Sequence, residues 1–368
     1  MTHSLTILGG GNTAFAVAAN LALRGFAITI YEHPHFASAL EPIQHNRTIR
    51  LLGVAEQGNA TLAHVTTDLA AALRNDLLLL IVPAYAHKPF AETCAPHLRD
   101  GHMLVITPGT LGALEFAQIV RATGNSSDIA FAETDTAPYV CRKTAPDTAT
   151  IWGVVSGLGL GVYPASKTQA VADALQTVFT VNGKSDTRSA IVTYPNVLAC
   201  GLSAMNPVVH PAGVLMNAGR VEYSRGDFYF YEEGVSPTVA QVIYGVDGER
   251  RAIGRALGFD LLPVDEAFHN GGFGPKGDLW ATINGSRMLT QLRAPGAINT
   301  RWLTEDIPYG IGAWSRLGAQ LGVATPLMDA LVTLASVALG QDFKQATRTP
   351  ERLGLAGMGA AAMVQHVA

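Results

Sequence analysis

The chain has 368 residues, of which 48% are hydrophobic and 15% charged, with a formal net charge of −4. This composition excludes a disordered chain, and the small negative charge predicts neither a nucleic-acid partner nor a membrane-surface partner. The length suits two domains.

The cysteines and the N-terminal residues indicate the cellular compartment in which the protein is expected. Cys94, Cys141 and Cys200 are few and widely spaced, which is typical of neither a disulfide framework nor a zinc site. The N-terminal residues lack the charged and apolar regions of a secretion signal. His33 and His35 have no evident third ligand, so we expect an exposed loop there. We therefore expect a cytoplasmic protein with no bound metal.

The first predicted elements are a strand at residues 5–8 and a helix from about residue 14 to 24, joined by a glycine-rich turn. Gly9-Gly10-Gly11-Asn12-Thr13-Ala14 has the G-x-G-x-x-A form of a dinucleotide-binding turn. Gly9 permits the tight turn, Gly11 lets a pyrophosphate approach the backbone, and Ala14 keeps the helix close to the sheet. The pyrophosphate would then lie on the free N–H groups at the start of the helix.

The next predicted strand, residues 28–31, ends at an acidic residue that indicates the cofactor. Glu32 follows Gly11 by twenty-one residues, the position at which a carboxylate accepts hydrogen bonds from the adenosine ribose. No Arg or Lys lies between Glu32 and Arg47, so no local clamp for a 2′-phosphate is evident. The pattern predicts an NAD site and favours NAD over NADP; a purely structural strand, turn and helix is the alternative.

Strands and helices then alternate, which predicts an α/β domain with a doubly wound parallel sheet of the Rossmann type. We expect Pro83 and Thr107 at the carboxyl ends of two of its strands, where such sheets bind ligands. The loop at 182–186 suggests a boundary, with a dinucleotide-binding domain over 1–188 and an α-helical domain over 189–368. The expected strands are 76–83, 103–109 and 129–133, and the expected helices are 67–75, 87–98 and 111–123, with short strands over 150–164.

The second half reads as all-α, with helical patterns at 194–215, 238–257 and 317–339. It contains three histidines, His210, His269 and His366, and only His210 lies inside an apolar helical stretch. Asn206 precedes it by one helical turn, so both side chains are expected on one face. A buried structural histidine is the alternative interpretation of His210.

The sequence resembles the NAD-dependent opine dehydrogenases from end to end. The resemblance rests on separated motifs that occur in the family's order. They are the glycine turn with Asn12, Thr107-Pro108-Gly109, Ala113-Leu114-Glu115-Phe116, Glu133-Thr134, Cys141-Arg142, residues 206–211, Asn217-Ala218, Tyr231, Glu233-Gly234, Ser236-Pro237, Asn299-Thr300-Arg301, Glu305-Asp306, Thr325-Pro326 and Arg348-Thr349.

The resemblance implies a Rossmann domain joined to a helical catalytic domain, and reductive condensation of an amino acid with an α-keto acid such as pyruvate. It implies that His210 is the catalytic histidine, that Asp306 pairs with it, and that Arg301 binds a substrate carboxylate. An Asp on one ring nitrogen fixes the imidazole tautomer, and a guanidinium suits a carboxylate. Asn206 is expected as a polar neighbour of the reacting centre. The partners would be small molecules, and a homodimer is left open.

The sequence departs from the family pattern at two positions, and two other functions fit the same fold. Pro207 is expected to tilt the helix near His210, and Asp135 places a charge where the family is hydroxyl-rich, which would favour a basic substrate. A hydroxy-acid or polyol-phosphate dehydrogenase on the same fold is one alternative, although such enzymes often use a central Lys and the second half offers only Lys276 and Lys344. A non-catalytic NAD-binding sensor is the other.

Overall fold

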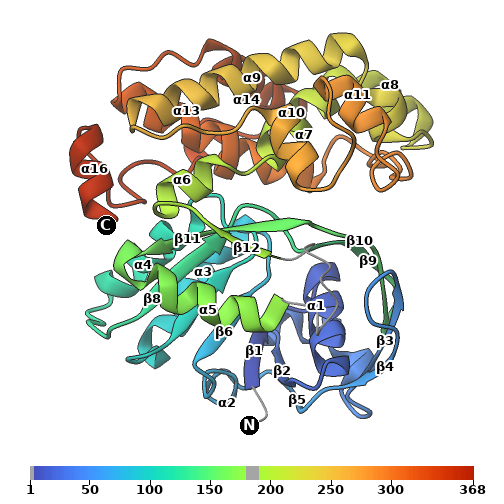
Figure 1. Cartoon of the computed structure of the whole chain (residues 1–368), viewed down its shortest axis with the longest axis vertical. Helices are drawn as coiled ribbons and strands as arrows, with labels where there is room; N and C mark the ends of the chain where they lie inside the picture. The colour runs from blue at the N-terminus through green and yellow to red at the C-terminus, as the bar shows by residue number, and fades with distance from the viewer. Residues whose placement is uncertain (1–3, 180–189) are drawn as a thin grey trace. The chain divides into compact units, whose positions relative to one another are not determined.

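A computed structural model describes residues 4–179 and 190–368, and the chain divides into two compact units, Met1–Val197 and Leu198–Ala368 (Figure 1). The first unit is built on β-sheets and the second is helical. The boundary expected between residues 188 and 189, and the loop 182–186 on which it rested, lie outside the described residues.

The main sheet of the first unit has the strand order β12-β11-β8-β7-β6-β1-β2-β5. All neighbouring strands pair in parallel except β11, which runs antiparallel to β8. The order reverses direction between β1 and β6, and ligands bind at such a switch point in doubly wound sheets. The strands are β1 Ser4–Leu8, β2 Ala27–Tyr31, β5 His64–Thr66, β6 Leu77–Leu80, β7 Met103–Ile106, β8 Ala130–Thr134, β11 Gly157–Tyr163 and β12 Ala190–Thr193.

A second sheet of four strands, β4-β3-β10-β9, was only partly anticipated from the sequence. Its strands are β3 Thr48–Gly53, β4 Gly58–Thr61, β9 Tyr139–Ala145 and β10 Thr148–Val154. Because β3 pairs in parallel with β10, segments about a hundred residues apart lie side by side. Short strands at 150–164 were expected, but the strands between residues 48 and 61 were not.

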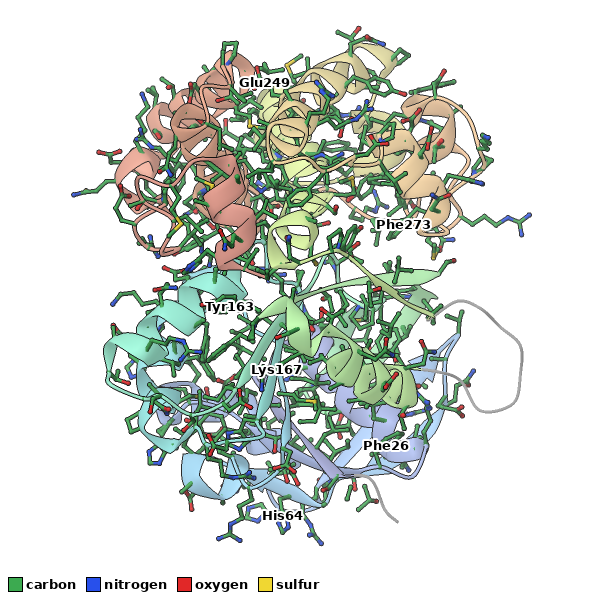
Figure 2. The ribbon with its side chains drawn as sticks, turned by 60° about the vertical axis from the view of Figure 1, so that its left-hand side comes forward. Phe26, His64, Tyr163, Lys167, Glu249 and Phe273 are labelled. Carbon is green, nitrogen blue, oxygen red and sulfur yellow. The ribbon has the colours of Figure 1, made fainter. Side chains whose placement is uncertain are left out.

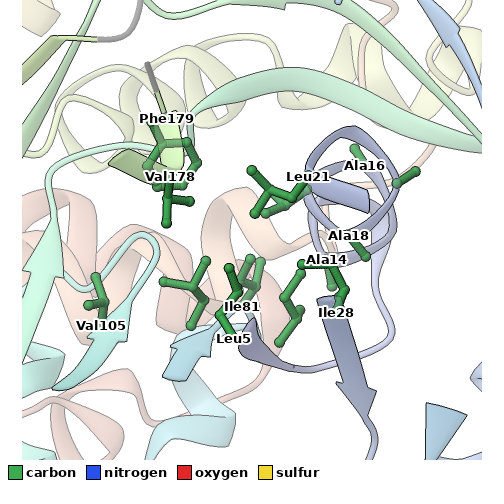
Figure 3. Packing of buried hydrophobic residues seen from close by; sticks show 14 of the residues in the cluster. Leu5, Ala14, Ala16, Ala18, Leu21, Ile28, Ile81, Val105, Val178 and Phe179 are labelled. Atoms are coloured by element: carbon green, nitrogen blue, oxygen red, sulfur yellow. The ribbon is translucent and has the colours of Figure 1, made fainter. Parts of the chain in front are cut away.

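Helix α1, Asn12–Leu23, packs against β9 and β4 of the second sheet as well as against β1 and β2. A helix covered on two sides must be apolar all round, which explains its alanine-rich sequence. Ala14, Ala16, Ala18 and Leu21 of α1 belong to one core cluster with side chains of the main sheet (Figure 3).

Two of the remaining helices of the first unit, α2 and α3, are shorter than expected. The helix expected at 67–75 is only α2, Leu69–Ala72, and Asp68 is its N-cap, accepting from the amides of Ala70 and Ala71. The helix expected at 87–98 is α3, which gives way at residue 95 to a 3₁₀ turn. The helices and turns are α3 His87–Cys94, α4 Gly112–Ala122, α5 Thr168–Phe179, η1 Pro34–Ala39, η2 Glu41–Ile43, η3 Ala84–Ala86, η4 Ala95–His97 and η5 Ala165–Lys167.

The second unit is helical, as expected. Its longest helix, α9, begins after the N-cap Ser236, and its Glu249 (labelled in Figure 2) accepts hydrogen bonds from the amides of Leu327 and Met328 at the start of α14. The helices are α6 Val197–Leu202, α7 Asn206–Met216, α8 Ala218–Ser224, η6 Phe230–Gly234, α9 Pro237–Ala256, α10 Val264–Asn270, α11 Leu279–Asn284, α12 Arg301–Thr304, η7 Asp306–Ile311, α13 Gly312–Gln320, α14 Pro326–Leu339, α15 Phe343–Ala346 and α16 Ala360–His366.

One stretch within the described residues, Val197–Met216, is long and apolar enough to cross a membrane by length and composition. Of its most apolar window, 89% is buried inside the protein. Burial of this extent is that of a core helix.

Candidate active site

The turn after β1 has a backbone that only glycine fits. Gly9 has φ +126°, and a Cβ there would lie 2.4 Å from the carbonyl oxygen of Ile81, which follows β6. The Gly9 amide donates to the carbonyl of Tyr31 at 2.8 Å. The turn is therefore held against the ends of β2 and β6, the two strands that neighbour β1.

Gly11 differs, because nothing in the protein requires it to be glycine. Its φ is −79°, and a Cβ built on it would meet no atom of the described residues within 4 Å. Gly11 is the N-cap of α1 without a side-chain hydrogen bond, so it leaves the first amides of the helix uncapped by any side chain. An open approach to the positive end of a helix is the geometry that a phosphate group needs.

The remaining residues of the predicted turn differ in burial. Ala14 is fully buried, as the close contact of helix and sheet requires, whereas Thr13 is half-buried and Asn12 is exposed. The side-chain carbonyl of Asn12 accepts from the Lys143 amide at 2.9 Å, so β9 borders the start of α1.

Glu32 is buried against the turn. Its carboxylate accepts from the Gly10 amide at 2.7 Å and from the His33 amide at 2.8 Å. Burial raises the pKa of Glu32, and these two amides together with the charges of His33 and Lys143 oppose that rise. A carboxylate has about four lone-pair positions, so two remain for ribose hydroxyls.

Lys143 supplies a cation that the local sequence did not reveal. Its ammonium lies 3.6 Å from the centre of the Phe15 ring and 3.4 Å from the carbonyl of Ala39. Burial lowers the pKa of Lys143, and the charge of Glu32 opposes this. The absence of Lys or Arg after Glu32 therefore does not leave this edge of the sheet without positive charge, because β9 brings one from residue 143.

Pro83 and Thr107 follow β6 and β7 at the same edge of the sheet. Thr107 is 2% exposed, and its hydroxyl has no hydrogen-bond partner among the described residues. Glu133 stabilises the loop after Thr107, because its carboxylate accepts hydrogen bonds from the amides of Leu111 at 2.7 Å and Ala113 at 2.9 Å. A buried hydroxyl without a protein partner, an open glycine and an uncapped helix together fit a dinucleotide cofactor.

In the second unit, His210 and Asp306 meet. Nδ1 of His210 lies 2.8 Å from Oδ2 of Asp306, and the His210 side chain is 9% exposed. A carboxylate only accepts hydrogen bonds, so Nδ1 carries a hydrogen and Nε2 is the nitrogen left for other chemistry. This arrangement is typical of a histidine used as a general acid and base.

Two further aromatic residues, which the sequence reasoning gave no role, complete the surroundings of His210. The hydroxyl of Tyr231 lies 2.9 Å from Nε2. The indole of Trp302 stacks on the imidazole with ring centres 4.4 Å apart and planes 7° from parallel. The imidazole is therefore held at both nitrogens and on one face. Their place beside His210 follows from tertiary contacts, so no local pattern could have revealed it.

The partners of His210 stand on two π-helical segments. Tyr231 lies on η6 and Asp306 on η7, and such segments are frequent at functional sites. Two glycines let them approach α7. A Cβ on Gly310 would lie 2.4 Å from Cβ of Pro207, and a Cβ on Gly213 would lie 2.5 Å from the Phe230 ring. Pro207, in the first turn of α7 where proline is tolerated, is thus a packing surface for η7.

The two predicted substrate-binding residues lie close by in sequence but outside this cluster. Arg301 begins α12, and its guanidinium is 59% exposed with a long 3.5 Å contact to Glu305. Asn206 is the first residue of α7 and is exposed, whereas His210 is buried. Asn206 and His210 therefore differ in exposure. The substrate-binding roles of Asn206 and Arg301 stay predictions.

Asp135 is occupied within the first unit. Its carboxylate accepts from the Gly159 amide and from the Tyr194 hydroxyl, each at 3.0 Å. Burial raises the pKa of Asp135 to about 6, opposed by these hydrogen bonds. These contacts are those of a structural residue, and a preference for a basic substrate stays a prediction.

Comparison with known proteins decides the family. Residues 193–339 match the family model described as NAD/NADP octopine/nopaline dehydrogenase, alpha-helical domain. An opine dehydrogenase from Arthrobacter sp. (strain 1C) is 31% identical over 362 residues, which are 98% of this chain and 97% of that protein. The chain belongs to the opine dehydrogenase family.

More distant relatives agree. The octopine dehydrogenase of Mizuhopecten yessoensis is 23% identical, covering 96% of this chain and 97% of that protein. A solved structure of octopine dehydrogenase with NADH and L-arginine superposes with a TM-score of 0.77 at 19% identity, covering 99% of this chain and 98% of that one. NADP⁺-bound yersinopine dehydrogenase superposes with a TM-score of 0.73 at 16% identity, covering 100% and 98%. These structures confirm the predicted fold of a Rossmann domain with a helical domain.

Proposed function

We propose that this opine dehydrogenase joins the amino group of an amino acid to the keto carbon of a small α-keto acid of the pyruvate type. The protein is an NAD(H)-dependent oxidoreductase acting on CH–NH donors, as its family membership shows. The observation that carries the proposal is the Asp306–His210 pair, which gives the helical unit a proton-handling group. Octopine dehydrogenase has been solved with L-arginine, agmatine or pyruvate, which supports small-molecule substrates of these classes.

We assign the cofactor to the turn at residues 9–14, with its pyrophosphate on the amides at the start of α1 and its ribose on Glu32. When bound, NADH supplies the hydride that reduces the carbon–nitrogen double bond. Pro83 and Thr107 would border the cofactor, with the Thr107 hydroxyl as a hydrogen-bonding group. We propose NAD as the preferred cofactor because Glu32 repels a 2′-phosphate.

The residues of the helical unit bind the substrates and manage protons. We propose that Arg301 binds the keto-acid carboxylate, since its side chain is exposed and its ion pair with Glu305 is long and therefore weak. Asn206 is proposed as a second polar contact. His210, oriented by Asp306, holds the proton that the carbonyl or carbinolamine oxygen receives before water leaves. A cytoplasmic location is proposed from the three free cysteines.

NADH oxidation tests the reaction directly. The purified enzyme is given pyruvate alone, and then pyruvate with each member of an amino-acid panel. The expected result is oxidation that requires both substrates and falls about 10²–10⁴-fold in His210→Ala, while NADH binding is unchanged. Oxidation with a keto acid alone would instead identify a hydroxy-acid dehydrogenase. Tight NADH binding without turnover on any pair, equal in His210→Ala, would identify a sensor.

The cofactor preference has its own test. The KM for NADH is compared with that for NADPH in the wild type and in Lys143→Met. We expect NADH to be preferred by the wild type. The loss of the ammonium beside Glu32 should weaken NADPH more than NADH, because NADPH carries the additional phosphate. Equal KM values for the two cofactors in the wild type would contradict the role given to Glu32.

A further inference from the structure

Tyr231 occupies the nitrogen of His210 that Asp306 leaves open. Its hydroxyl lies 2.9 Å from Nε2, and its side chain is 6% exposed. His210 therefore does not present a bare Nε2 to a substrate. A substrate oxygen must either push the phenol aside or exchange its proton through the phenol.

The phenol is held firmly in place. Its ring packs edge-on against Phe230 with ring centres 5.1 Å apart, and Trp302 lies within 6.2 Å. The segment η6 is tied to α7 because the Asn217 amide donates to the carbonyls of both Gly213 and Gly234 at 2.9 Å. Displacing the phenol would disturb this packing, so exchange through it is the simpler route.

The direction of the hydrogen bond between the Tyr231 hydroxyl and Nε2 of His210 depends on the protonation state of His210. Burial and the charge of Asp306 raise the pKa of Tyr231, so it remains a phenol across the working range of pH. When the imidazole is neutral, the phenol donates to Nε2. When Nε2 is protonated, its N–H donates to the phenolic oxygen, and the phenolic hydrogen is released for another acceptor.

We infer that Tyr231 is a catalytic residue that relays the proton of His210 to the substrate oxygen. This rests on the proposed function. The phenolic O–H bond breaks as an O–H bond forms on the carbinolamine oxygen. The Nε2–H bond breaks as the phenol is restored, and the imidazolium becomes neutral imidazole. The protonated hydroxyl leaves as water with the electron pair of its C–O bond, and the nitrogen lone pair forms the iminium that is reduced. In the oxidative direction the same steps run backwards.

The test compares Tyr231→Phe with Tyr229→Phe, a matched control at the N-cap of η6 whose ring instead lies 4.3 Å from the guanidinium of Arg293. Both variants lose one hydroxyl and keep the ring. For each we would measure kcat and KM with saturating NADH as a function of pH, together with a proton inventory in mixtures of H₂O and D₂O. NADH binding and the melting temperature show whether each variant is folded.

The relay predicts that Tyr231→Phe loses about 10²–10³-fold in kcat with little change in the KM for the keto acid. It also predicts that the curved proton inventory of the wild type becomes linear, while Tyr229→Phe behaves as wild type. A Tyr231→Phe enzyme with kcat within threefold of wild type and the same pH profile would overturn the relay. If Tyr231→Phe does not fold, Tyr231→3-fluorotyrosine keeps the shape of the side chain and makes the phenol a stronger acid. Because the phenol is the proton donor in the relay, kcat and its solvent isotope effect should then both change, and values equal to those of the wild type would also overturn the relay. A wild type without turnover would contradict the proposed function instead.

Discussion

The role of His210 depends on the side chains that surround it. In the sequence it is one imidazole in an apolar stretch, and burial as a structural residue was a fair alternative. The structure gives it a carboxylate at Nδ1, a phenol at Nε2 and an indole on one face. An imidazole held at both nitrogens has a defined tautomer, which general acid–base chemistry requires.

Asp306→Asn tests whether the charge of the carboxylate, and not only its shape, orients His210. The amide keeps the size of the side chain but can donate to Nδ1, which favours the tautomer that carries its hydrogen on Nε2. We expect kcat to fall roughly 10³-fold or more, with NADH affinity unchanged. Steady-state kinetics and an NADH titration measure both quantities. A variant with more than a tenth of the wild-type kcat would show that Asp306 does not orient His210.

Asp135 gives a prediction about stability against pH. Its pKa is raised by burial from 3.8 to about 6, so the folded state binds its proton more tightly than the unfolded state does. The corresponding stabilisation is present below about pH 4 and is lost as pH rises through 6, an effect on the order of 2–3 kcal/mol. Asp135→Asn should abolish this part of the pH dependence. Urea unfolding between pH 4 and 7.5 measures it, and parallel curves for the two proteins would contradict the assignment.

At the scale of elements, the glycine turn shows that similar residues have different roles. Gly9 is required by the fold, because its φ is +126° and a Cβ would strike the carbonyl of Ile81. Gly11 is not required by the fold, because a Cβ there would lie more than 4 Å from every atom in the part of the chain that the structure describes. The sequence motif names both positions but cannot tell the two requirements apart.

Gly9→Ala and Gly11→Ala form a matched pair that tests this difference. Gly9→Ala should lower the stability of the cofactor-free protein by a few kcal/mol, about 1–3 for the strained backbone plus the clash. Gly11→Ala should leave that stability within about 0.5 kcal/mol, yet weaken NADH binding by tenfold or more, since the methyl group would occupy the phosphate's approach. Thermal unfolding without cofactor and fluorescence titration with NADH give the two readouts. If Gly11→Ala binds NADH as tightly as wild type, the pyrophosphate does not lie where we place it.

At the scale of the whole molecule, the chain consists of two compact units, and the residues assigned to NADH lie in the first. A ligand that binds only the folded state stabilises it, by about 2.7 kcal/mol at a hundred times its dissociation constant. We expect NADH to raise the melting temperature and to slow amide exchange over residues 9–14. Hydrogen exchange with mass spectrometry measures this, with Gly11→Ala as the control that should show less protection. Protection that leaves residues 9–14 untouched would contradict the cofactor site.

The features that depend on local chemistry could be predicted from the sequence. The glycine turn, the acid after the second strand, the alternation of strands and helices and the helical second half all follow from the preferences of neighbouring residues. Tertiary structure alone decided the rest. It brings Asp306 to His210 across 96 positions of sequence, places Tyr231 on Nε2, and carries Lys143 to Glu32 from a sheet that local patterns only partly indicated. The physical reason is that these contacts depend on packing between distant segments, such as Gly310 against Pro207, and such complementarity leaves no periodic pattern in the chain.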